Sequence, residues 1–205
     1  MRKFLSEQSG RSMIEMLGVL AIIGVLSVGG IAGYSKAMAK YKQNKLGDQI
    51  SMLITNIRTL YGNSQNYKDL DTEAAIDMGA VDKEMHVTTS SGVATGIKNV
   101  YNSAASVFVK AASGDQSFYL IVTNLPSAAC TYLASSDWGS TAGSGWLAVG
   151  AMNAAGTEST TVDNCTKKAV SGGTGNPPDL PMTVANAANG CNGSGNTNTV
   201  VLQFE

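Results

Sequence analysis

The sequence predicts an α+β fold, in which a long N-terminal α-helix, about half of it able to span a membrane, packs on an antiparallel β-sheet. An uncharged apolar run fills residues 16–35, and an apolar stripe at helical spacing follows at residues 50–61. Two strand-like segments flank a short polar turn at residues 106–123, which is the pattern of an antiparallel hairpin. These three observations place the helix before the sheet.

Length and composition limit the chain to one soluble domain and a membrane segment. It has 205 residues and a formal net charge of −1, and charged residues make up only 14% of it. A surface that binds nucleic acid needs a strongly basic stripe, which this charge balance does not favour. Few charges and 23 glycines are more typical of exported surface proteins than of cytosolic enzymes. We therefore expect no nucleic-acid partner.

The apolar run at residues 16–35 is long enough to cross a membrane, since a helix of this length spans about 30 Å. A secretory signal peptide and a plain single-span anchor are the alternatives. A signal peptide ends at a cleavage site of small residues, whereas this run continues into a helical pattern at residues 34–41. Glu15 at the edge of the run also argues against a signal peptide, because an ionisable residue in a membrane span is costly and usually functional.

Beyond the membrane segment, the predicted helix continues but becomes amphipathic. Apolar residues recur at the spacing i, i+3, i+4, i+7 and i+11, namely at Ile50, Leu53, Ile54, Ile57 and Tyr61. Gly62 and Asn63 predict the C-terminal end of the helix. One helix from Ser12 to Tyr61 would be about 75 Å long. Its second half therefore presents an apolar stripe that a sheet can cover.

Short helices and strands are predicted after residue 62. Residues 72–78 read as a helix capped by Thr72, and a second helix at residues 124–134 has Pro126 in its first turn. The predicted strands are residues 106–112, 117–123, 146–149 and 197–204. The last of them alternates Val200, Leu202 and Phe204 with polar neighbours, which is typical of a half-buried strand.

The N-terminus combines a short leader with a glycine, an acid and an uninterrupted apolar helix. Arg2 and Lys3 lie in the polar segment that ends at Gly10, and Glu15 is the fifth residue after this glycine. This combination resembles the class III signal sequence of type IV prepilins. The resemblance implies that a membrane peptidase cuts between Gly10 and Arg11 and methylates the new N-terminal amine. It also implies that Glu15 aligns subunits as they dock, by pairing with the amine of a neighbouring subunit.

Two features depart from the usual pattern of that family. Arg11 stands where the family usually has Phe, Met or another apolar residue. Gly24, Gly29, Gly30 and Gly33 occupy the helix where many pilins have a proline. Glycine lowers helix stability by about 1 kcal/mol relative to alanine, so this stretch could unwind inside a filament. The spacing of Gly29 and Gly33 also suits close helix approach, although small residues are equally tolerated in any membrane helix.

The resemblance implies three segments: a leader at residues 1–10, a long helix at residues 11–62 with its transmembrane and filament-core part at residues 13–35, and a globular α/β head at residues 63–205. The pattern Leu-Pro-x-x-x-Cys-x-x-Leu at residues 125–133 and the Cys…Asn-Thr…Phe pattern at residues 191–204 are similar to type IVb pilins. Their heads carry a large, disulfide-closed C-terminal region. We therefore expect the glycine-rich stretch after residue 139 to be ordered.

The three cysteines, Cys130, Cys165 and Cys191, match no zinc or redox spacing. In an exported domain, one disulfide with one cysteine left over is the expected arrangement. Cys130 and Cys191 each adjoin a predicted element, the helix at residues 124–134 and the last strand. This position favours a bond between them, and Cys165–Cys191 is the rival pairing.

Nothing in the sequence indicates an enzyme. No P-loop, GxSxG, HExxH or GxGxxG arrangement occurs, and the single histidine, His86, is interpreted as a solvated loop residue. We expect no catalytic residues, no metal and no cofactor. The chain is interpreted as a structural subunit of an extracellular type IV pilus. A pseudopilin of a type II secretion system and a membrane-anchored adhesin are the alternatives.

The resemblance also implies partners and a location. The partners are other pilin subunits in a homopolymer, the prepilin peptidase, the inner-membrane assembly machinery, and membrane lipid before assembly. The location is the inner membrane, crossed once with the N-terminus inside and the C-terminus outside, and then the extracellular pilus.

Overall fold

The computed structural model describes residues 8–141 and 144–205, with the side chains of its first helix from Met13 onward. This helix, α1, runs from Gln8 to Leu60 and includes Gly10 and Arg11. The chain forms two compact units, Met1–Lys42 and Gln43–Glu205. The second unit is called the head below. It takes in the C-terminal part of α1, whereas the sequence analysis began the head at residue 63.

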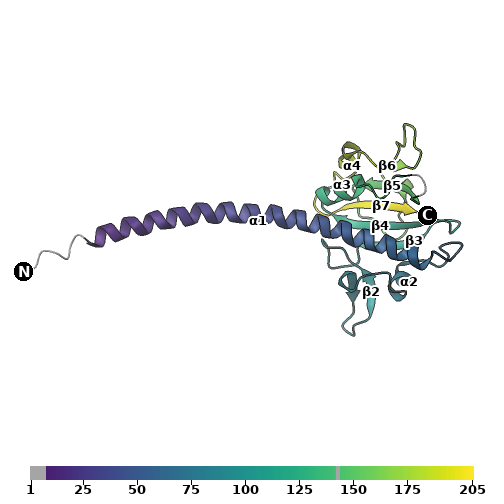
Figure 1. Ribbon diagram of the computed structural model, residues 1–205, viewed down its shortest axis with the longest axis horizontal. Coiled ribbons are helices and arrows are strands. Elements are labelled where there is room, and N and C mark those ends of the chain that lie inside the picture. Colours follow the sequence, from purple (N-terminus) through teal and green to yellow (C-terminus); the bar gives the residue numbers. More distant parts are fainter. Residues whose placement is uncertain (1–7, 142–143) are drawn as a thin grey trace, which may run out of the picture. The chain divides into compact units, whose positions relative to one another are not determined.

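The head is built on one antiparallel sheet of seven strands in the order β1-β2-β3-β4-β7-β5-β6 (Figure 1). The strands are β1 (His86–Thr88), β2 (Ala94–Ile97), β3 (Val107–Ala111), β4 (Phe118–Leu125), β5 (Trp146–Met152), β6 (Lys167–Val170) and β7 (Asn198–Phe204). In sequence β7 is the last of them, yet in space it lies between β4 and β5. The final strand therefore fills the gap between β4 and β5 and joins the two parts of the sheet. The α+β fold that the sequence predicts is confirmed.

The strand β7 is buried on both faces, and not half-buried as its apolar residues predicted. Leu202 lies opposite Leu120 of β4 on one side and opposite Val149 of β5 on the other. All three side chains are fully buried in the main core. Because successive side chains of a strand point to opposite faces, Val201 joins a smaller cluster on the other face of the sheet.

The apolar stripe of α1 supplies one side of the main core. Leu46, Ile50, Leu53 and Ile57 are 0–1% exposed and belong to the same cluster as Leu120. Full burial of a side chain of this size is worth about 1.5–3 kcal/mol. The amphipathic half of the helix therefore packs on the sheet, as the periodicity predicts.

Three short α-helices and two 3₁₀ turns complete the described part of the chain. They are α2 (Thr72–Asp77), the 3₁₀ turn η1 (Lys83–Met85), α3 (Ser127–Ser135) and α4 (Val184–Gly190), with a further 3₁₀ turn η2 (Val162–Asn164). In Figure 1, α3 and α4 lie beside one another near β5 and β6, whereas α2 lies near β2 at the other end of the sheet.

Some local predictions need correction. The cap of α2 is Asp71, whose side chain accepts a hydrogen bond from the backbone N–H of Ala74, and not Thr72. Pro126 precedes α3 as its N-cap instead of lying in the first turn. The hairpin of β1 and β2, the strand β6 and the helix α4 were not predicted at all.

Candidate assembly surface

The N-terminal part of α1 exposes a continuous apolar surface. Between Met13 and Ile31, large apolar side chains are exposed to between 52% and 76%: Met13, Ile14, Met16, Leu17, Val19, Leu20, Ile22, Ile23, Val25, Leu26, Val28 and Ile31. By length and composition, α1 is able to cross a membrane. A soluble monomer rarely leaves so much contiguous apolar area in water, so this surface is one that lipid or other protein chains cover.

Glu15 is the one acidic residue in this apolar segment. Its side chain is exposed, and no hydrogen bond or ion pair holds it within the described parts of the chain. A carboxylate surrounded by apolar side chains is costly once the surface is covered, unless it gains a partner.

The glycines of this segment leave its surface open to close approach. A methyl group added at Gly24, Gly29, Gly30 or Gly33 would meet nothing within 4 Å. Flat patches of this kind let the backbones of two membrane helices come close together. Gly10 and Arg11, the predicted cleavage residues, lie in the first turn of α1, and the side chain of Arg11 falls outside what the structure describes.

The head is closed by a disulfide between Cys130 of α3 and Cys191, the C-cap of α4, with an Sγ–Sγ distance of 1.99 Å. Both cysteines are at most 1% exposed. This is the pairing that the sequence analysis favoured over Cys165–Cys191. The bond encloses β5, β6 and α4, so the described residues of the glycine-rich stretch between the two cysteines are part of the head.

The free cysteine, Cys165, follows η2 and packs against the smaller core cluster. Its Sγ lies 3.6 Å from the carbonyl oxygen of Thr161, to which it donates a weak hydrogen bond. Burial raises the pKa of the Cys165 thiol to about 12, with Lys168 lowering it and Asp163 raising it by smaller amounts. A thiol with so high a pKa is protonated and unreactive at neutral pH.

His86 is not the solvated loop residue that we expected. It begins β1, pairs with Ile97 and is only partly exposed. Its Nε2 atom is covered and has no hydrogen-bond partner among the described residues. The described residues also contain no group of three or more His, Cys, Asp or Glu side chains that could hold a metal ion.

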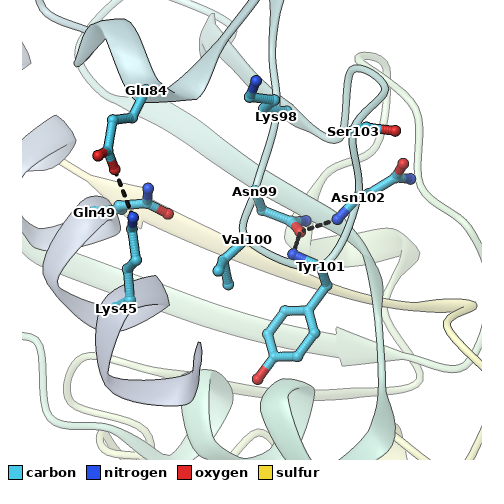
Figure 2. A pocket seen from close by; sticks show the side chains of 9 residues that line it. All are labelled: Lys45, Gln49, Glu84, Lys98, Asn99, Val100, Tyr101, Asn102 and Ser103. Carbon is cyan, nitrogen blue, oxygen red and sulfur yellow. Dashed lines mark hydrogen bonds and ion pairs between the residues drawn. The ribbon is translucent and has the colours of Figure 1, made fainter. Parts of the chain in front are cut away.

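A polar pocket of about 450 Å³ lies in the head between α1 and the loop at residues 98–103 (Figure 2). Lys45 and Gln49 line it from α1, and Glu84 lines it from η1. The Nζ atom of Lys45 and the Oε2 atom of Glu84 form an ion pair 2.6 Å apart. The sequence does not predict this pocket, because its walls come from three segments that are separate in sequence and carry no motif.

The exposed apolar helix, the antiparallel head and the disulfide-closed C-terminal region together define a pilin-type subunit. The family model described as PilS N terminal matches residues 40–204, so the chain belongs to this family. It is a type IV pilin, and its partners include other pilin subunits.

Among solved structures, the chain is similar to the crystal structure of TcpA, a type IV pilin from Vibrio cholerae El Tor biotype. The two share 15% sequence identity, with a TM-score of 0.47, and the match covers 80% of this chain and 99% of the other. A comparison with curated proteins finds no significant match.

Proposed function

We propose that this chain is made as a prepilin, is cut between Gly10 and Arg11, and assembles from the inner membrane into an extracellular pilus. The observation that carries the proposal is the uncovered apolar surface of α1 between Met13 and Ile31. Before assembly, lipid covers this surface, with the N-terminus inside and the head outside. During assembly, the same surfaces of neighbouring subunits cover one another, so the apolar helices stay out of water after they leave the membrane.

Cleavage would place a positive α-amine on Arg11, four residues before Glu15, and methylation of this amine would keep its charge. In one helix these two groups lie close together, but a neighbouring subunit shifted along the fibre axis can offer its own amine instead. Such a pair between subunits gives each charge a partner inside the apolar core of the fibre. Glu15 would thus set the axial position of each incoming subunit.

The test separates insertion, processing and assembly. Glu15→Gln keeps the size of the side chain and removes its charge. We expect membrane insertion and leader cleavage at the level of the parent protein, and at least a tenfold loss of fibres, counted by electron microscopy of sheared surface material. Asp48→Asn is the matched control, since Asp48 is an exposed acid further along α1, and it should leave fibre yield unchanged. Fibre yield from Glu15→Gln equal to that of the parent would rule out the docking role.

The same preparation distinguishes the pilus subunit from the alternatives. Fibres composed mainly of this chain support the pilin function. Surface protein that carries the processed chain but no fibres would instead support a monomeric, membrane-anchored adhesin.

A further inference from the structure

The polar pocket between α1 and the loop at residues 98–103 has features that assembly does not explain. Its volume of about 450 Å³ falls within the range of about 300–1,000 Å³ that is usual for ligand sites. In Figure 2, Lys45 and Gln49 extend from α1 on one side, and the loop lies on the other side. The pocket is therefore a feature of the folded head alone, and the inference does not depend on the formation of fibres.

The loop is held in place by one buried side chain, Asn99. Its Oδ1 atom accepts hydrogen bonds from the backbone N–H groups of Tyr101 (2.8 Å) and Asn102 (3.1 Å), as Figure 2 shows. Its Nδ2 atom donates to the carbonyl oxygen of Thr123, 2.9 Å away in β4. Because Asn99 is only 4% exposed and both ends of its amide are bonded, the loop is anchored to the sheet. The pocket wall is thus preorganised before any ligand arrives.

Several donors in the wall remain available. The side chain of Lys98 makes no ion pair within the described residues, and the same residues offer no partner to the Nδ2 atom of Asn102. Both side chains are partly exposed, and Ser103 also lines the pocket with a hydroxyl group. These groups can donate hydrogen bonds to a ligand, and one of them carries a positive charge.

Acceptors line the opposite wall. The Oε1 atom of Gln49 is buried and accepts no hydrogen bond from the described residues. This atom has almost no accessible surface, so a ligand hydroxyl reaches it only if the Gln49 amide turns toward the pocket. Glu84 has one carboxylate oxygen paired with Lys45, which leaves the other oxygen as a second acceptor.

We propose that this pocket binds an acidic saccharide, that is, a sugar ring that carries one carboxylate. Lys98 would hold the carboxylate, because a charge-assisted hydrogen bond is about twice as strong as a neutral one. The hydroxyl groups of a sugar both donate and accept, so they match a wall in which Asn102 donates and the unpaired carboxylate oxygen of Glu84 accepts. Val100, which lies between Gln49 and Tyr101 in Figure 2, offers the apolar contact for the C–H face of the ring.

Other ligand classes fit the wall less well. Lys45 and Lys98 against Glu84 give a net charge of about one positive unit, which suits a carboxylate but is little for a phosphate group with two charges. The backbone N–H groups of Tyr101 and Asn102 already bond to Asn99, so they do not form an anion-binding nest. A purely apolar ligand would leave the free donors without partners.

The test uses the full chain in a zwitterionic detergent without a sugar headgroup, since glycoside detergents would compete for the pocket. Binding of glucuronate, glucose and acetate is measured by saturation-transfer NMR and by calorimetric titration. We expect glucuronate to bind at least tenfold more tightly than either glucose or acetate, because only glucuronate has both the ring and the charge. Equal affinity for acetate would show a simple anion site, and equal affinity for glucose would show that the charge has no role; either result overturns the proposal.

Substitutions of residues that line the pocket test whether glucuronate binds there. Lys98→Met keeps the length of the side chain and should lower glucuronate affinity at least tenfold, whereas glucose binding should not change. Asn102→Ala should weaken the binding of both sugars. Lys68→Met, which removes an exposed lysine elsewhere on the head, is the matched control and should leave the affinity of the parent. Far-UV circular dichroism confirms that each variant is folded, and full glucuronate affinity in folded Lys98→Met would refute the site.

Discussion

Gly150 in β5 lies directly beneath the side chain of Cys165. A Cβ atom at Gly150 would stand 2.5 Å from the Sγ atom and 2.7 Å from the Cβ atom of Cys165, and 3.4 Å from the Cα atom of Val162. The absence of a side chain at this position therefore lets η2 and its flanking loop approach the sheet. This contact joins the free thiol to the smaller core cluster.

Gly150→Ala should destabilise the head by about 1–3 kcal/mol, because the added methyl group overpacks a closed contact. The free energy of unfolding is measured by denaturant titration of the full chain in detergent, followed by near-UV circular dichroism. Cys165→Gly in the Gly150→Ala background should recover part of this loss, and the single Cys165→Gly variant supplies the fourth corner of the double-mutant cycle. Strictly additive effects of the two substitutions would contradict the contact.

The raised pKa of Cys165 makes the head less stable in alkali. The folded thiol keeps its proton up to about pH 12, whereas the unfolded thiol loses it near its ordinary value of 9.0. Its contribution to the free energy of unfolding is therefore fully present below pH 9 and is lost between pH 9 and about 12, by up to about 1.4 kcal/mol per pH unit. Unfolding of the parent and of Cys165→Ala should be compared across this range, so that the shared titration of the tyrosines cancels. Parallel curves would mean that the thiol is not buried in solution.

Removing the disulfide should strongly lower the free energy of unfolding of the head. Cys130 and Cys191 are 61 residues apart in sequence, and closing a loop of this length stabilises a fold by about 4 kcal/mol in the chain-entropy model. The double variant Cys130→Ala/Cys191→Ala should lose about this much free energy of unfolding, and it also avoids a new unpaired thiol. Peptide mapping without reductant checks the pairing directly. A peptide that joins Cys165 to Cys191 would show that the rival connection forms.

Asn99→Ala should destabilise the head by about 2–4 kcal/mol. The substitution leaves the N–H groups of Tyr101 and Asn102 and the carbonyl of Thr123 without their partner, and an unpaired buried group costs about 1–3 kcal/mol. Amide hydrogen exchange should accelerate in the loop at residues 98–103 and remain unchanged in β5 and β7. Asn186→Ala is the control, since Asn186 is a partly exposed residue of α4, and its effect should stay below about 0.5 kcal/mol.

Processing at the N-terminus is tested by replacing the predicted cleavage glycine. Gly10→Leu should abolish leader removal, because a bulky side chain does not fit a peptidase site shaped for glycine. N-terminal sequencing of the surface protein should give Arg11 as the first residue of the parent and Met1 for the variant. Gly18→Leu, also a glycine of α1 with open space around it, should be cleaved as the parent is. A parent chain that begins at Met1, or beyond residue 35, would contradict the prepilin function.

The parts of the fold that the sequence predicted are those with a strong local pattern. The stripe at Ile50, Leu53 and Ile57 has a helical period and one buried face, and the β3–β4 hairpin has apolar strands around a polar turn. The missed hairpin of β1 and β2 has strands of three and four residues with a glycine in the second, too short for an alternating pattern to stand out. The polar pocket could not be predicted, because Gln49, Glu84 and Asn102 come together only when α1, η1 and the loop have packed.

The place of β7 in the middle of the sheet sets the order in which the chain can mature. Until residue 204 has been synthesised, β4 and β5 have no neighbour between them, and their facing backbone groups are unpaired. The apolar part of α1 leaves the ribosome long before that point, so it can engage the membrane while the head is still unfolded. The head therefore completes its core only after residue 204 has been synthesised, when β7 can pair with both β4 and β5.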